Sequence, residues 1–265
     1  MIYDLQKASL WKRVAAFMLD MVLLVIIATG VLALLSAVTG FDGYRQTYLD
    51  RMQFIEDEYA LVQSGVLDEK THLFDITEQA YSELSEQNRA LYDQAAQAFL
   101  KDTEAMAAYD MMCNLLLLFV SIPLLVGYMI VEFVVPLIMK NGQTVGKKVF
   151  SLGVVRVDGV RITPLQLLVR TLLGKFTIET MVPALLVLMF LGGLGGIIGP
   201  GVIFGIIVLE VIVAVASKTN SLIHDLLAGT AVVDLSSQMI FDTVEDLLEY
   251  KKKLQAEIAA DSKYF

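Results

Sequence analysis

RVAAFMLD, residues 13–20, joins a charged N-terminal segment to a long apolar run and carries a carboxylate into that run. From Val14 to Val38 the run spans 25 residues, more than the roughly 20 that a helix needs to cross a bilayer. The pattern predicts a transmembrane helix over residues 14–38, retained as an anchor because a signal peptide has a shorter apolar region. An ionised group at membrane depth costs roughly 3 kcal/mol on the lower insertion scales, so Asp20 should find a partner, with Arg13 the nearest candidate.

The composition of the whole chain is typical of an integral membrane protein. Hydrophobic residues make up 56% of the sequence, the mean hydropathy is +0.65, and the net charge of -9 belongs to the loops. This balance excludes a nucleic-acid binder. The single Cys113 permits no intramolecular disulfide and no cysteine-based metal site, and no nucleophile–base pair with a supporting motif occurs. We therefore expect neither an enzyme nor a cofactor.

Charge asymmetry predicts which side of the membrane each loop faces. Residues 1–13 carry three basic residues beside Trp11, whose ring suits the headgroup layer, and this segment is predicted to be cytoplasmic. Residues 41–110 instead hold 15 acidic against 5 basic residues, which places this loop outside.

The acidic loop at residues 41–110 also has helical periodicity. One helix is predicted near residues 44–63, followed by a turn at Gly65 and residues 68–75. The apolar face of a second helix consists of Tyr81, Leu84, Leu91, Ala95 and Phe99. We expect an extracytoplasmic helical hairpin that stands above the membrane as an acidic cap. Its charges either keep an exposed helix pair soluble or attract cations.

The second half of the chain predicts three further spans. Residues 111–139 form the second span, residues 177–191 the third and residues 197–216 the fourth. The uncharged core of the third span is only about 12 residues long, so a re-entrant segment is the alternative. Glycines at 192–196 separate the third span from the fourth.

The loop between the second and third spans, residues 140–175, is rich in basic residues and is predicted to be cytoplasmic. Within it, VVRVDGVRIT at residues 154–163 alternates around Asp158-Gly159 and predicts a short β-hairpin. Residues 164–175 place charged side chains among leucines, which favours a helix lying at the inner interface.

The tail, residues 217–265, returns to the cytoplasm, so both termini are predicted to lie inside. An amphipathic helix is expected from Asp242 onward, with Asp242 and Glu245 as a capped start, and it would dock on a partner or on a second copy. The predicted fold is therefore an all-α integral membrane protein with four transmembrane helices, an extracytoplasmic helical hairpin and a small cytoplasmic β-hairpin. We place it in the cell membrane as a multi-pass protein.

Four acidic residues lie in or beside the apolar spans. Asp20, Glu132 and Glu210 each lie about 10 to 12 Å inside the cytoplasmic boundary, and Glu179 lies nearer to it. Carboxylates at one depth repel when all are ionised, and shared protons or a bound cation would relieve the repulsion. These acids are the candidate ion-binding or proton-binding residues. The rival interpretation is a structural polar cluster that fixes helix packing.

Arg13, Arg170 and Asp225 are the candidate charge partners of these acids. Arg13 lies seven residues before Asp20, close to the same helical face, and can neutralise it. Asp225 follows His224, and this pair is open to two interpretations. It is a proton relay, or it is a polar pair at the start of a short cytoplasmic helix that receives a basic residue such as Arg13.

Three motifs together resemble the RDD family of membrane proteins, which is named for one arginine and two aspartates. They are R-x-x-A-x-x-x-D at residues 13–20, NGQTVGKKVFSLGVVRVDG at residues 141–159 and HDLLAGTAVV at residues 224–233. The resemblance implies that Arg13 and Asp20 are the arginine and the first of the two aspartates for which the family is named. It also implies that Asp225 is the second aspartate. It also implies a transport-related role, since cation/proton antiport is attributed to some members. The acidic insert at 41–110 departs from the compact form of the family.

The carboxylates and the resemblance together predict ion or small-solute transport, most concretely cation/proton exchange. Asp20 would be the proton or cation site, with Glu132 and Glu210 as auxiliary carboxylates. The expected partners are the lipid bilayer, a monovalent cation and a proton, and a chain of this size would form a homo-oligomer to enclose a pathway. The alternative is a non-transporting assembly or regulatory protein whose buried charges hold the helices together.

Overall fold

The computed structural model describes residues 8–191, four helical pairs (201–202, 204–205, 208–209 and 212–213) and residues 221–261. Glu210 and most of the predicted fourth span lie outside the described residues. The chain forms two compact units, one made of Met1–Val31 with Ser121–Phe265 and the other of Leu32–Val120. We call them the membrane unit and the insert unit.

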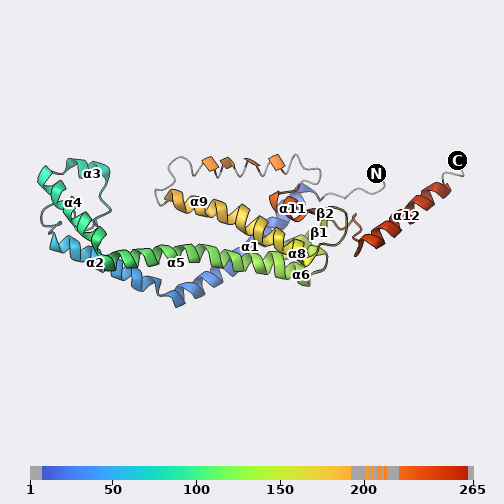
Figure 1. The fold of residues 1–265 in the computed structure, drawn as a ribbon, viewed down its shortest axis with the longest axis horizontal. Coiled ribbons are helices and arrows are strands. Elements are labelled where there is room, and N and C mark those ends of the chain that lie inside the picture. Colours follow the sequence, from blue (N-terminus) through green and yellow to red (C-terminus); the bar gives the residue numbers. More distant parts are fainter. Residues whose placement is uncertain are drawn as a thin grey trace. The chain divides into compact units, whose positions relative to one another are not determined.

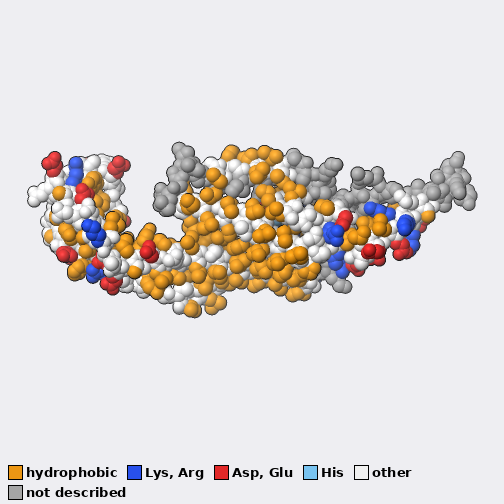
Figure 2. Space-filling model, viewed as in Figure 1, with side chains coloured by type: hydrophobic (Ala, Val, Ile, Leu, Met, Phe, Trp, Pro, Cys, Tyr) orange, Lys and Arg blue, Asp and Glu red, His pale blue; other side chains and the backbone are white. Residues whose placement is uncertain are grey.

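Three helices in the described part of the chain are long and apolar enough to cross a membrane (Figure 1). The first is α1 (Leu10–Thr39); the second joins α5 (Thr103–Tyr128), η1 (Met129–Val134) and α6 (Val135–Ile138); the third joins α8 (Pro164–Leu168), η3 (Val169–Met181) and α9 (Val182–Leu191). Hydrophobic side chains cover the long helices of the membrane unit on the face drawn in Figure 2. Large apolar side chains of α1 such as Val22 and Ile26 are more than half exposed, as lipid contact requires.

The third of these helices is longer than the sequence predicts. An interfacial helix at 164–175 and a separate span at 177–191 were expected, but residues from Pro164 to Leu191 continue without a break. Thr163 starts the helix with a capping box, because its hydroxyl accepts from the Gln166 N–H and the Gln166 side chain accepts from the Thr163 N–H. Two of its charged residues, Arg170 and Lys175, are buried inside the protein.

The membrane unit contains one small antiparallel sheet in its described part. Strand β1 (Leu152–Arg156) pairs with β2 (Thr230–Asp234), with Leu152 opposite Asp234 and Arg156 opposite Thr230. The predicted hairpin at 154–163 is therefore wrong in its main strand pairing. Its turn does form, since Gly159 has a φ of +87° and the Arg156 N–H donates to the Val160 carbonyl at 2.9 Å.

Burial explains why the distant strand is the partner of β1. Leu152 and Val154 of β1 are fully buried, and Val232 of β2, which lies opposite Val154, belongs to the same apolar core. Ala16 of α1 and Leu167 of α8 pack in the same core as the strands. The sheet thus joins the loop after the second span to the chain beyond α11 (Ile223–Ala228), which ends at Gly229 with a φ of +63°.

The insert unit forms a helical subdomain with its own core. Its helices α2 (Phe41–Glu58), α3 (Glu78–Glu83) and α4 (Glu86–Lys101) lie between the ends of α1 and α5 in the chain. Four residues of the predicted stripe pack here, with Ala95 and Phe99 fully buried and Leu84 and Leu91 against the same core. Two predicted boundaries are wrong. The first helix ends at Glu58 instead of residue 63, and the second is divided where Ser85 caps α4.

The tail helix α12 (Val244–Asp261) begins one residue later than its predicted cap implies. Thr243 and Asp246 bond to each other's backbone N–H at 3.1 Å, so they form the capping pair instead of Asp242 and Glu245. Asp242 instead forms an ion pair with Arg161 at 2.8 Å.

Candidate functional site

Asp20 is buried on α1 and is held by the loop that follows the second long helix. Its carboxylate accepts from the Thr144 hydroxyl at 2.5 Å and from the Gly146 N–H at 2.7 Å. Both donors belong to the start of α7 (Val145–Val149), where Thr144 is the N-cap. The Lys147 ammonium lies 3.9 Å from the same carboxylate. A helix start leaves backbone N–H groups without intrahelical acceptors, so an acid is well placed there.

Two glycines let the chain approach closely enough for these contacts. A Cβ at Gly146 would lie 2.2 Å from the carbonyl oxygen of Ala16, and a Cβ at Gly174 would lie 2.4 Å from the Cβ of His224. Neither position has room for a side chain. The motifs at residues 13–20 and 141–159 are therefore two sides of one packed contact.

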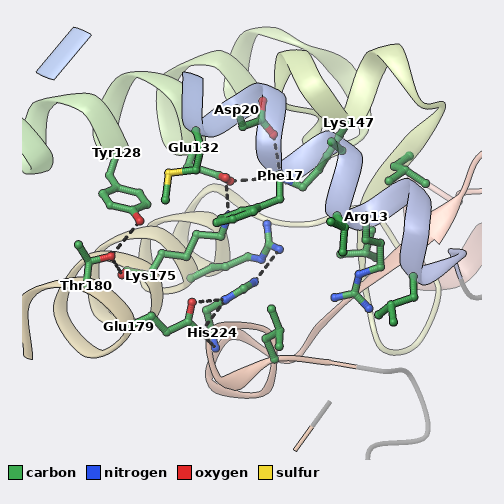
Figure 3. A pocket seen from close by; sticks show the side chains of 18 residues that line it. Arg13, Phe17, Asp20, Tyr128, Glu132, Lys147, Lys175, Glu179, Thr180 and His224 are labelled. Carbon is green, nitrogen blue, oxygen red and sulfur yellow. Dashed lines mark hydrogen bonds and ion pairs between the residues drawn. The ribbon is translucent and has the colours of Figure 1, made fainter. Parts of the chain in front are cut away.

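Glu132 is the second buried acid, and it lies on the π-helical segment η1. Its carboxylate forms ion pairs with two ammonium groups, Lys147 at 3.2 Å and Lys175 (Figure 3). The Thr171 hydroxyl donates to the Glu132 backbone carbonyl at 2.9 Å, which joins η1 to η3. Lys147 thus lies between the acids of the first and second long helices.

Asp225 and His224 begin α11 and meet charges from α1 and η3. The Arg170 Nε donates to the Asp225 carboxylate at 2.9 Å, and Arg13 lies 3.5 Å from its other oxygen. The Thr230 hydroxyl adds a third donor at 2.9 Å. His224 contacts Arg170 through Nε2 at 3.1 Å and Glu179 through Nδ1 at 2.8 Å.

The π-helical geometry of η3 brings its charged residues to one face. Arg170 and Lys175 are five residues apart, as are Gly174 and Glu179, and a π-helix repeats its hydrogen bonds at that spacing. The hydroxyls of Thr177 and Thr180 likewise donate to the carbonyls five residues earlier, both at 2.8 Å. An α-helical projection of the sequence would spread the same residues around the helix.

Burial and neighbouring charges shift three groups outside the spanning helices. Burial raises the pKa of Asp225, but Arg170, His224 and Arg13 outweigh it and hold the pKa well below its ordinary value. Burial lowers the pKa of His224, so the imidazole is neutral. A proton on Nδ1 then donates to Glu179 while Nε2 accepts from Arg170. Burial also lowers the pKa of Lys147 to about 8, against the opposing effect of Glu132.

The described charges balance in two groups. Asp20 and Glu132 lie with Lys147 and Lys175, and the second group contains Glu179, Asp225, Arg13 and Arg170 around the neutral His224. Each group holds two acids and two bases. The sequence predicts repulsion between these carboxylates, and in the described structure basic side chains form ion pairs with them and neutralise their charge.

One sequence-based pairing is wrong. Arg13 was expected to neutralise Asp20, but the ion pair recorded for Arg13 is with Asp225, and Asp20 is held by Thr144, Gly146 and Lys147. The interpretation of His224-Asp225 as a polar pair that starts a short helix and receives Arg13 agrees with these contacts.

The roles of Lys147 and Lys175 were not predicted, because the basic residues of the segment 140–175 were interpreted only as a sign of its cytoplasmic location. They are only 7% exposed, and Arg170 only 2%, which is exceptional for such residues unless they are paired. The sequence did contain a signal for these basic partners. It was the number of acids predicted in or near the membrane, because each buried acid needs a basic group to neutralise it.

The two groups of charges border a cavity of about 400 Å³ in the membrane unit. Asp20, Glu132, Glu179 and Lys147 all line it, together with apolar side chains that include Phe17 (Figure 3). Among the described residues no cluster of three or more acids, histidines or cysteines is arranged to hold a metal ion.

This fold and site define a helical membrane protein with a buried, charge-balanced network that joins three long helices and a small sheet. The chain belongs to the RDD family, whose model matches residues 7–229, as the three motifs predict. No curated protein and no solved structure matches it. The match includes Arg13, Asp20 and Asp225, and it ends before β2 and α12.

Proposed function

We propose that this protein exchanges a monovalent cation for a proton, with Asp20 and Glu132 as the carboxylates that bind the cation. The observation that carries the proposal is the cavity of about 400 Å³, which Asp20, Glu132 and Glu179 all line. Carboxylate and hydroxyl oxygens are the ligands that hard cations prefer, and Thr144 supplies a hydroxyl beside Asp20. Ionisable groups in a membrane protein mark ion and proton pathways by default.

The proposal includes the orientation and surroundings of the chain. Both termini and α7 lie in the cytoplasm, and residues 41–110 lie outside, as their excess of acids favours. The protein is a multi-pass protein of the cell membrane. It forms homo-oligomers, because three or four spans are few to enclose a pathway alone.

A second candidate function rests on the charge balance. Each described carboxylate of the site already has a hydrogen-bond or ion-pair partner, so the network can act purely to hold α1, η1, η3 and α11 together. Buried ion pairs of this kind are retained in some proteins because they specify one packing arrangement. The protein would then serve assembly or regulation, with the insert unit and α12 contacting other proteins.

Flux through liposomes distinguishes the two functions. The purified protein is reconstituted with a trapped pH-sensitive dye and challenged with sodium, potassium or lithium. Exchange predicts a cation-dependent pH change that Asp20→Asn and Glu132→Gln abolish. Glu69→Gln, at an exposed carboxylate of the insert unit, is the matched control and should leave the flux unchanged. If wild-type protein gives no flux for any of these cations between pH 6 and 9, the assembly function replaces transport.

A further inference from the structure

Two hydroxyl groups on facing helices form a directed chain of hydrogen bonds beside the cavity. The Thr180 hydroxyl donates its single proton to the Lys175 backbone carbonyl at 2.8 Å. The hydroxyl oxygens of Thr180 and Tyr128 are also 2.8 Å apart, so the proton in this second bond comes from Tyr128 (Figure 3). The chain therefore runs from Tyr128, the last residue of α5, through Thr180 to the backbone of Lys175 on η3.

Packing fixes the position of the Tyr128 hydroxyl. Tyr128 is 7% exposed and shares a small apolar core with Leu24 of α1. The ring of Phe176, on η3, packs edge-on against it with 6.3 Å between the ring centroids. A Cβ at Gly127 would lie 3.2 Å from the Leu24 side chain, so α5 and α1 are in close contact here. Tyr128 is therefore a rigid donor, and its hydroxyl determines where Thr180 lies.

The chain of hydrogen bonds ends on the residue whose side chain pairs with Glu132. The Lys175 ammonium forms an ion pair with the Glu132 carboxylate, and the Thr171 hydroxyl donates to the Glu132 backbone carbonyl at 2.9 Å. Thr171 precedes Lys175 by four residues and Thr180 follows it by five. Hydroxyl bonds thus join η3 to the second long helix on both sides of the ion pair. A slip of one helix along the other would break both bonds.

The bond from Thr180 to Lys175 is specific to the π-helical geometry of η3. In an α-helix a threonine hydroxyl bonds back to a carbonyl three or four residues earlier, as Thr29 of α1 does to Val25 at 2.8 Å. The Thr180 hydroxyl instead reaches five residues back, which is the spacing at which a π-helix repeats. The bond therefore stabilises the helical geometry that turns Lys175 toward Glu132.

We infer that Tyr128 and Thr180 are positioning residues of the proposed cation site, which hold Lys175 against Glu132 and thereby limit the affinity of that carboxylate for a cation. This inference rests on the proposed function, because it assigns the two hydroxyls to the same site. All four residues line the cavity. The Lys175 ammonium and a cation in the cavity are attracted to the same carboxylate, so a loosened Lys175 leaves Glu132 more available to the cation.

The first test measures the initial rate of sodium-driven proton release from liposomes as a function of sodium concentration. Thr180→Val keeps the shape of the side chain and removes both hydrogen bonds, and Tyr128→Phe removes only the donor. Each variant should lower the KM for sodium, by roughly two- to tenfold for one lost hydrogen bond. Thr180→Ser keeps the hydroxyl and should have the wild-type KM. A general folding defect would instead reduce the maximal rate and leave the KM unchanged.

Thr177→Val is the matched control for the first test. The Thr177 hydroxyl makes the same five-residue bond, to the Leu172 carbonyl at 2.8 Å, but Thr177 is exposed on η3. Its variant should therefore keep the wild-type KM. If Thr180→Val and Tyr128→Phe also keep the wild-type KM, the inference is overturned while the transport proposal survives. An equal fall in KM for Thr177→Val overturns it too, because any hydroxyl of η3 would then suffice.

The second test does not depend on transport. Melting temperatures in detergent are compared for wild type, Thr180→Val, Lys175→Met and the double variant, with Glu132→Gln in place of Lys175→Met if the latter does not fold. Thr180→Val should lower the melting temperature less when the ion pair that it positions is already lost. Equal shifts in both backgrounds overturn the inference. If wild type gives no flux but the two positions are coupled, the transport proposal fails and Thr180 still positions Lys175.

Discussion

Gly146 lies against the carbonyl oxygen of Ala16 so closely that the Cβ of any other residue would stand 2.2 Å from that oxygen. The same glycine donates its N–H to Asp20 at 2.7 Å. One residue of the loop after the second long helix therefore both packs on α1 and satisfies the acid buried there. The contact links the two most distinctive sequence motifs of the chain.

Gly146→Ala should destabilise the folded protein, because the atom that the new methyl group meets is backbone and cannot rotate away. Overpacking of this kind costs about 1 to 3 kcal/mol, and loss of the hydrogen bond to Asp20 adds to that. The melting temperature in detergent measures the effect. Gly43→Ala is the matched control, since a Cβ at Gly43 meets nothing within 4 Å. Equal melting temperatures for both variants would contradict the close packing of α7 on α1.

Arg170 and Asp225 should behave as a coupled pair in stability measurements. Arg170→Gln or Asp225→Asn alone leaves a buried charge without its main partner, which costs roughly 3 to 5 kcal/mol, and the double substitution should recover part of that loss. Asp20→Asn combined with Arg13→Gln should instead be close to additive, because the contacts of Asp20 are with Thr144, Gly146 and Lys147. Strong coupling between Arg13 and Asp20 would show that the sequence-based pairing was right.

Stability should rise with pH between about 8 and 10.5 because of Lys147. Its pKa is lower in the folded protein, so within this window the unfolded chain binds the proton and the folded chain does not. Raising the pH then favours folding, by up to about 3 kcal/mol across the window. The measurement is the difference in unfolding free energy between wild type and Lys147→Gln as a function of pH. Lys148→Gln should follow wild type, and a flat difference would contradict the lowered pKa.

Labelling of single cysteines should place α4 outside and the end of β1 inside. In a Cys113→Ala background, Gln87→Cys on α4 and Val157→Cys after β1 replace exposed side chains and avoid the cap formed by Ser85 and the positive φ of Ser151. A membrane-impermeant maleimide applied to intact cells should label position 87 and leave position 157 unlabelled until the cells are opened. Labelling of position 157 from outside would reverse the orientation.

Properties that depend on neighbouring residues in the chain could be predicted from the sequence. The apolar run after Arg13 is long enough to cross a membrane, and the structure has a helix there. The stripe through Leu91, Ala95 and Phe99 packs into the core of the insert unit because side chains three and four residues apart share a helical face. That Asp20 requires a buried partner also follows from its cost in an apolar environment.

The identity of each partner depended on the tertiary structure. Asp20 is satisfied by a helix start more than a hundred residues away, and the main partner of β1 is a strand beyond the third long helix, while the residues after its own turn add only a short bridge. Neither contact has a local signature, since hydrogen bonds and ion pairs depend on distances that only packing establishes. Arg170 and Lys175 share a face because η3 is π-helical, whereas the α-helical period assumed in reading a sequence separates them. The sequence by itself determined that charges would be buried with partners, and the packing of α1, η1, η3 and α7 decided which charges those partners are.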